Sequence, residues 1–101
     1  MIKRIEQLPY SFQKDIEHAI KILKENGAEE VYLFGSIVNG GFSESSDIDI
    51  AVKGIKKRDF YKVTSILKFE INTDFDLVDL DDKNNRFSQM LLKKGTLVRV
   101  G

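Results

Sequence analysis

With 101 residues and no cysteine, the chain is too short to fill a second hydrophobic core and has no disulfide framework or cysteine-based zinc site. Its 16 basic and 16 acidic residues leave a formal net charge of zero, so the overall charge does not favour direct binding to nucleic acid. No apolar stretch approaches the length of a membrane span. We therefore expect one domain, residues 1–101, located in the cytoplasm and without a membrane partner.

The first half of the chain reads as a helix, a strand and a glycine-rich loop. Apolar residues recur at helical spacing over residues 12–23, and Gly27 follows as a plausible C-terminal cap. Residues 31–34 form a short β-branched and aromatic run that ends abruptly, as a buried strand does when it enters a turn. Residues 35–46 are rich in glycine and serine, which predicts a loop with at most a short helix starting near Ser36.

The second half of the chain alternates strands and helices. In residues 47–52 acids fall on one side and isoleucines on the other, which is the period-two pattern of a half-buried strand. These elements predict an α/β (α+β) fold, a small mixed β-sheet with helices packed mainly on one face. The remaining expected elements are a helix over 59–70, a strand over 75–80, a helix over 84–93 that ends at Gly95, and a terminal strand over 97–100.

Carboxylates gather on the strand over 47–52. Asp47 and Asp49 are two residues apart, so their side chains emerge from the same face with Cα atoms roughly 6.5–7 Å apart. Two metal ions bridged by such carboxylates can stabilise both the attacking and the leaving oxygen of a phosphoryl displacement. We expect a third carboxylate from Asp76, because Phe75 and Leu77 on either side of it would face the core. A site of oxygen ligands favours Mg²⁺ or Mn²⁺ over zinc.

A turn suited to phosphate precedes the acidic strand. Gly35-Ser36 lies where a strand ends and a short helix is expected to begin, a place where unpaired backbone N–H groups attract phosphate. Gly35 would let a triphosphate approach the backbone, and Ser36 would add a hydroxyl donor. The loop lacks the Gly-Lys-Ser/Thr ending of a P-loop, and a Rossmann dinucleotide fingerprint is absent. The sequence therefore excludes these two nucleotide-binding classes.

Taken together, these residues resemble a known family. Gly35-Ser36, ten residues, and then Asp47-Ile48-Asp49 resembles the Gly-Ser-x(10)-Asp-x-Asp signature of the DNA polymerase β-like nucleotidyltransferase superfamily. Residues 75–78 resemble the strand that carries the third carboxylate of that superfamily. Residues 93–98 resemble the end of its minimal branch, the MNT-domain proteins. One departure lies at Val38-Asn39, where family members commonly have a small residue and then Arg, so a phosphate contact made by that Arg is missing or supplied elsewhere.

The resemblance implies a Mg²⁺-dependent enzyme that transfers a nucleoside monophosphate, AMP from ATP, onto a hydroxyl. It assigns Asp47 and Asp49 to the metal on the nucleoside triphosphate, and Asp76 to a second Mg²⁺ and to the proton of the acceptor hydroxyl. Small members of the family are frequently paired with a helical HEPN-domain protein, as the antitoxin that adenylylates a tyrosine of its partner. The implied partners are therefore a nucleoside triphosphate and a HEPN-type protein.

The sequence leaves several functions open. A non-catalytic module that neutralises a partner by contact would make the acids dispensable. An aminoglycoside-type transferase is disfavoured by the short length of the chain. A glycosyltransferase with an Asp-x-Asp motif would leave Gly35-Ser36 unexplained. The acceptor, the preferred nucleotide and the existence of an oligomer are also open.

Other conspicuous residues are given structural roles. Asp74 and Asp79 are weaker carboxylate candidates, because Asp74 lies at the entrance of its strand and Asp79 falls on the opposite face from Asp76. His18 has no companion His or Cys and is placed on the surface. The aromatic side chains expected in the core, and not as platforms that stack on a base, are Phe12, Phe60, Phe69 and Phe87. In the last helix, Phe87, Met90 and Leu91 are expected to point inward.

Overall fold

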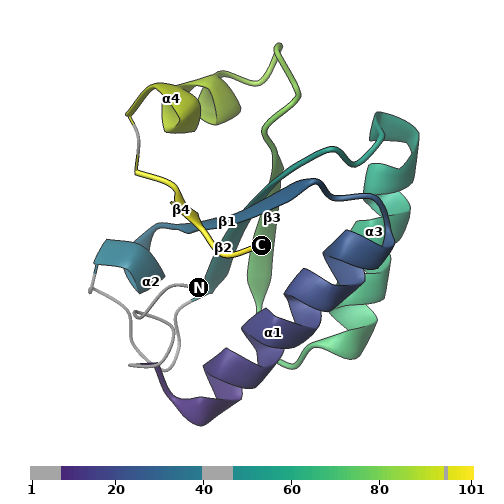
Figure 1. Cartoon of the computed structure of the whole chain (residues 1–101), viewed down its shortest axis with the longest axis vertical. Coiled ribbons are helices and arrows are strands. Elements are labelled where there is room, and N and C mark those ends of the chain that lie inside the picture. The colour runs from purple at the N-terminus through teal and green to yellow at the C-terminus, as the bar shows by residue number, and fades with distance from the viewer. Residues whose placement is uncertain (1–7, 40–46, 95) are drawn as a thin grey trace.

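The computed structural model describes residues 8–39, 47–94 and 96–101, and helices alternate with strands through most of this part of the chain (Figure 1). Each expected element is found within three residues of its predicted bounds, including the short helix at Ser36. The expected loop glycines and serines over 40–46, and Gly95 after the last helix, lie outside the described residues. In chain order the elements are α1 (Tyr10–Glu25), β1 (Glu30–Phe34), α2 (Ser36–Asn39), β2 (Ile48–Lys53), α3 (Lys57–Glu70), β3 (Phe75–Asp79), α4 (Arg86–Lys94) and β4 (Val98–Arg99).

The strands form one mixed sheet in the order β3-β2-β1-β4. β1 runs antiparallel to β2 and to β4, whereas β3 runs parallel to β2. A parallel pair needs a long crossover, which α3 supplies between β2 and β3. β2 is therefore an inner strand, and β3 is an outer strand of the described sheet.

Helices α1 and α3 lie side by side on one face of the sheet and enclose the main hydrophobic core (Figure 1). Alternate residues of β2 point into this core, because successive side chains on a strand face opposite sides. Full burial of a large aliphatic side chain contributes about 1.5–3 kcal/mol each, so this layer is the principal stabilising contact of the fold. Its most buried members include Ile48, Ile50 and Val52 from β2, Ile16 and Leu23 from α1, and Val63 and Leu67 from α3.

The opposite face of the sheet carries a smaller apolar cluster under α4. Leu91 of α4 is buried against Phe34, Ala51 and Leu80. The prediction of a mixed sheet with helices mainly on one face is confirmed, with α4 as the helix on the other face. Because Asp49 alternates with the buried isoleucines of β2, its side chain faces the side on which α4 lies.

Three of the residues assigned to the core are exposed, and for them the prediction is wrong. Phe69 is 90% exposed, Phe87 44% and Met90 39%, whereas Phe12 is buried as expected and Phe60 packs, partly buried, against the main core. Phe69 lies two positions after the buried Leu67, which places it about 200° around the helix and away from the sheet. In α4 the buried residues are Ser88 and Leu91, so the contact of this helix with the sheet is narrow.

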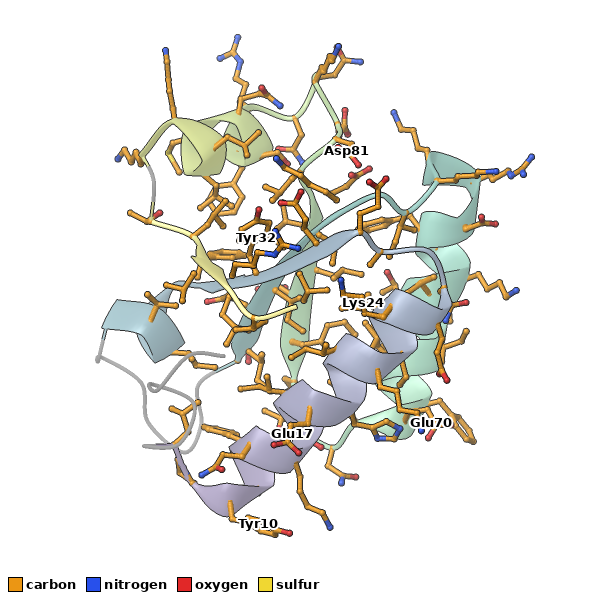
Figure 2. The ribbon with its side chains drawn as sticks, viewed as in Figure 1. Tyr10, Glu17, Lys24, Tyr32, Glu70 and Asp81 are labelled. Carbon is orange, nitrogen blue, oxygen red and sulfur yellow. The ribbon has the colours of Figure 1, made fainter. Side chains whose placement is uncertain are left out.

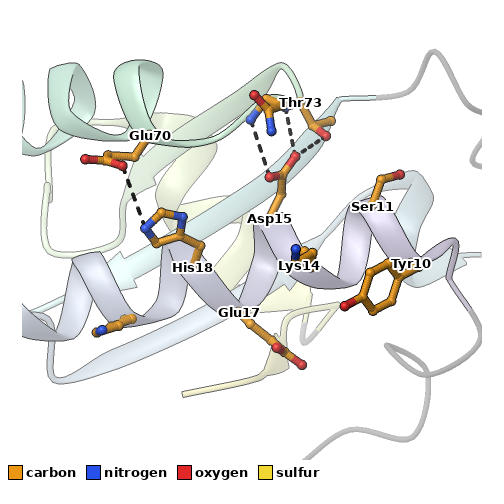
Figure 3. Close-up of a pocket in the computed structure, with 10 residues that line it drawn as sticks. Tyr10, Ser11, Lys14, Asp15, Glu17, His18, Glu70 and Thr73 are labelled. Carbon is orange, nitrogen blue, oxygen red and sulfur yellow. Dashed lines mark hydrogen bonds and ion pairs between the residues drawn. The ribbon is translucent and has the colours of Figure 1, made fainter.

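A buried aspartate of α1 fixes the turn that leads into β3 (Figure 3). Asp15 is 6% exposed, and its Oδ2 accepts hydrogen bonds from the backbone N–H of Thr73 at 2.9 Å and from the Thr73 hydroxyl at 2.5 Å. Its Oδ1 accepts a longer bond from the backbone N–H of Asn72 at 3.4 Å. These bonds satisfy the buried carboxylate and tie α1 to the start of the strand that carries Asp76. On the same surface, His18 is exposed as predicted, with its Nε2 3.9 Å from Glu70 Oε2.

The opposite end of the sheet is closed by a contact between two loops. Asp81 lies on the segment that follows β3 (Figure 2). Its carboxylate accepts a hydrogen bond from the backbone N–H of Gly54 at 2.7 Å, which joins this segment to the one that follows β2. Asp79 Oδ1 accepts a bond from the backbone N–H of Asp81 at 2.9 Å. The Asp79 carboxylate therefore stabilises a turn. Separately, no helix in the described ranges combines the length and the apolar character needed to cross a membrane.

Candidate functional site

Asp49 lies at the centre of the candidate site because β2 is an inner strand. Its Cα partner on β1 is Phe34, and its Cα partner on β3 is Asp76. Register partners on neighbouring strands share a face at a spacing of about 4.7–4.9 Å, so the Asp49 and Asp76 side chains lie side by side. Asp47 comes just before β2, two residues ahead of Asp49, and is exposed. Asp47, Asp49 and Asp76 thus lie at the same end of the sheet, where β1 ends and β2 and β3 begin.

Gly35 brings the end of β1 against the Asp49 carboxylate. It adopts a φ of +75°, a conformation that L side chains rarely enter. A Cβ built on Gly35 would lie 3.1 Å from Asp49 Cγ and would overlap its Oδ2. Glycine is therefore required here both by the backbone and by the neighbouring acid. The sequence predicts room for a phosphate at Gly35, whereas in the structure the Asp49 carboxylate fills part of this space.

The charges of the three acids are coupled. Partial burial is the main cause that raises the pKa of Asp49 above its ordinary value of 3.8, followed by the negative charges of Asp76 and Asp47. A divalent cation would relieve this repulsion, and an all-carboxylate donor set matches the oxygen ligands that Mg²⁺ prefers. Within residues 8–39, 47–94 and 96–101, no three His, Cys, Asp or Glu side chains are already arranged to enclose a metal ion. Sharing an ion would therefore require side-chain rotations at Asp47, Asp49 and Asp76.

An open groove of about 610 Å³ extends from these acids across the face of the sheet under α4. Asp49, Asp76 and Gly35 line one part of it, and the rest is lined by apolar side chains together with Thr96. Ser36 is the half-buried first residue of α2, and neither Ser36 nor Asp47 is among the residues that line this groove. The remaining lining residues are Phe34, Leu77, Val78, Phe87, Leu91 and Thr96.

Asp76 also borders a second groove, of about 550 Å³, between α3 and the outer strand β3. Phe60 and Tyr61 contribute aromatic surface to it, and Lys57 and Lys68 contribute positive charge. Asp76 is thus accessible from the face of the sheet and from its outer edge. Strand parity in the sequence predicts Asp76, but access to Asp76 from the outer edge depends on the order of the strands, which no local sequence pattern indicates.

The raised pKa of Asp49 predicts how stability depends on pH. Ionising Asp49 costs more in the folded protein than in the unfolded chain, so the metal-free protein should lose stability as the pH rises from below 3.8 through the raised pKa. Asp49→Asn removes this loss. We expect the Tm of the variant to exceed that of the parent by about 2–5 °C at pH 7 and to converge with it near pH 3. Thermal melts in a chelator across this pH range measure the difference, and a variant that melts lower than the parent at pH 7 would contradict a raised pKa of Asp49.

Comparison with known proteins places this arrangement in a family. Residues 17–99 match the family model described as Polymerase beta, Nucleotidyltransferase, so the chain belongs to the polymerase β nucleotidyltransferase family and is a nucleotidyltransferase. The family and the fold class expected from the signature are confirmed. No curated protein matches the sequence significantly.

Several solved structures similar to this chain come from toxin–antitoxin complexes. A chain of a toxin–antitoxin complex with AMP-PNP is 28% identical with a TM-score of 0.63, and the match covers 85% of this chain and 69% of that one. A chain of the MntA–HepT toxin–antitoxin complex is 26% identical with a TM-score of 0.60, covering 86% of this chain and 69% of that one. A variant of that complex gives 27% identity and a TM-score of 0.64 over 85% of this chain and 71% of that one.

Proposed function

We propose that this nucleotidyltransferase transfers AMP from ATP to a hydroxyl, a tyrosine of a helical HEPN-type partner, and that it acts as the antitoxin of that partner. The observation that carries the proposal is the register that puts Asp49 beside Asp76 and against Gly35. The similarity to a toxin–antitoxin complex with AMP-PNP supports an adenine nucleotide as substrate. The similarity to the MntA–HepT complex supports the class of partner.

Each proposed site residue has a distinct task. Asp47, Asp49 and Asp76 would hold two Mg²⁺ ions, which when bound supply positive charge against the phosphate oxygens. The turn at Gly35-Ser36 would bind the triphosphate through a backbone N–H group and the serine hydroxyl. Asp76 would accept the proton of the acceptor hydroxyl. The acceptor oxygen then forms a bond to the α-phosphorus while the bond from that phosphorus to pyrophosphate breaks.

The position of Asp76 on the outer strand supports a large acceptor. A nucleotide in the groove under α4 would reach Asp76 from the face of the sheet, which leaves the groove beside α3 free for the acceptor. A side chain presented by another protein can enter from that outer edge without passing the nucleotide. The chain itself would therefore contribute positioning and charge, and the partner would contribute the acceptor.

The discriminating experiment uses α-labelled ATP, Mg²⁺ and a purified HEPN-type partner, with the parent protein and Asp47→Asn compared side by side. We expect label on the partner with the parent protein and little or none with Asp47→Asn, although both proteins fold. The alternative is a module that neutralises its partner by contact alone. Neutralisation of the partner without label, and equal for both proteins, would support that alternative and refute the transfer.

A further inference from the structure

Phe87 is an aromatic side chain of α4 that remains partly exposed in the groove that contains Asp49 and Asp76. It is 44% exposed, although the sequence pattern predicts a core residue. It lines the same groove as Asp49 and Asp76. Its ring lies 5.7 Å from that of Phe34, centroid to centroid, with an angle of 60° between the planes. Since Phe34 is 6% exposed, Phe87 is the member of this pair that offers a ring surface to the groove.

The position of Phe87 is fixed by contacts at the start of α4. The Asn85 side-chain oxygen accepts hydrogen bonds from the backbone N–H groups of Phe87 at 2.9 Å and of Ser88 at 3.2 Å, as an N-terminal cap does. The buried Ser88 hydroxyl donates to the backbone carbonyl of Asp79 at 2.8 Å, which ties α4 to the end of β3. With its backbone fixed in this way and its ring packed against Phe34, Phe87 loses little conformational freedom when a flat ligand packs on it.

The two parts of the groove differ in chemistry. Gly35, Asp49 and Asp76 form a part suited to metal-bound phosphates, whereas the part beside Phe87 is apolar. A nucleotide has the same division, with charge at the triphosphate and a flat aromatic base at the other end. Among the described residues of the groove, Thr96 is the polar side chain that accompanies the apolar part, whose other members are Phe34, Leu77, Val78, Phe87 and Leu91.

We propose that Phe87 is the stacking platform for the nucleobase of the bound nucleoside triphosphate. The inference rests on the proposed function, because it takes the acids of the same groove as the triphosphate site. Stacking on an aromatic ring is tolerant of base identity, because every base has a π-face. A site with few polar groups around the base cannot strongly reject one purine in favour of another. The described residues therefore predict tighter binding of purine than of pyrimidine nucleotides, with ATP and GTP differing by no more than about a few-fold.

The test measures dissociation constants and does not depend on transfer. MgATP and Mg-tripolyphosphate are titrated into the parent protein, Phe87→Ala and Phe87→Tyr, with thermal melts to verify folding. Tripolyphosphate carries the charge of the nucleotide without its base. We expect Phe87→Ala to weaken MgATP binding about tenfold and to leave tripolyphosphate binding unchanged, and Phe87→Tyr to restore MgATP binding. Phe69→Ala is the matched control, because Phe69 is 90% exposed on α3 and does not line the groove.

Three results would overturn the inference. They are unchanged MgATP binding in Phe87→Ala, an equal loss for both ligands, and a parent protein that binds neither ligand. An equal loss would mean that Phe87 supports the packing of α4 and not the base. If Phe87→Ala weakens MgATP selectively but the parent protein transfers no label, the proposed function fails and the base site stands.

Discussion

Asp49→Asn is expected to lower the rate of label transfer by about 10³-fold or more. Asp49 lies on the inner strand β2, beside its register partner Asp76 and within contact distance of Gly35. Removing its charge should weaken binding of the proposed Mg²⁺, whose positive charge would stabilise the transition state by several kcal/mol. Initial rates at saturating ATP and Mg²⁺ measure the loss, and the variant should melt no lower than the parent protein.

Asp74→Asn is the matched control for this loss. Asp74 lies two residues before Asp76 and is exposed, but it does not line the groove under α4. Its structural contact is made by the backbone, through a carbonyl that accepts a hydrogen bond from the N–H of Ile48 at 2.9 Å. We therefore expect Asp74→Asn to retain nearly full activity. Similar losses in Asp49→Asn and Asp74→Asn would show that activity depends on the total negative charge at this end of the sheet and not on Asp49 itself.

Gly35→Ala is expected to reduce both stability and transfer. A non-glycine residue in this left-handed conformation costs about 1–3 kcal/mol, and the overlap of its Cβ with the Asp49 carboxylate adds to that cost. In a domain of this size, the Tm should fall by about 5–15 °C. Transfer should fall about as far as in Asp49→Asn, since the methyl group pushes the carboxylate away from its position beside Asp76. Melts and initial rates measured on the same preparation test both effects.

Gly27→Ala separates backbone strain from displacement of Asp49. Gly27 has a φ of +104°, but a Cβ at this position would meet the Gly54 carbonyl at an ordinary 3.9 Å. This variant should therefore lose stability and keep its transfer activity at temperatures where it is folded. If Gly35→Ala behaves in the same way as Gly27→Ala, the close approach of Gly35 to Asp49 has no role in catalysis.

The local parts of the candidate site were predictable because they depend on short spacings along the chain. Asp47 and Asp49 share a face through the period of a strand, and Gly35-Ser36 was recognised as a turn after a hydrophobic run. Asp76 followed from the same alternation on a second strand. The ten-residue spacing between Gly35-Ser36 and Asp47 indicates the nucleotidyltransferase family, which the comparison with known proteins confirms.

The rest of the arrangement depends on contacts between distant elements. The burial of Asp15 against Thr73 joins residues 58 positions apart, and no local pattern marks such a pair. Helical periodicity shows that one side of a helix is apolar, but it does not show how wide the contact with the sheet will be. For this reason the sequence pattern predicts Phe87 and Met90 in the core, although α4 buries a narrow stripe on the more open face.

A crystal structure of the protein with Mg²⁺ and a non-hydrolysable ATP analogue tests the central claim most directly. We expect electron density for cations bound about 2.0–2.1 Å from carboxylate oxygens of Asp47, Asp49 and Asp76, with the phosphates at the Gly35-Ser36 turn. Only side-chain rotations of the acids should accompany binding. A nucleotide bound away from these residues, or cations that leave Asp76 without a metal contact, would contradict the account.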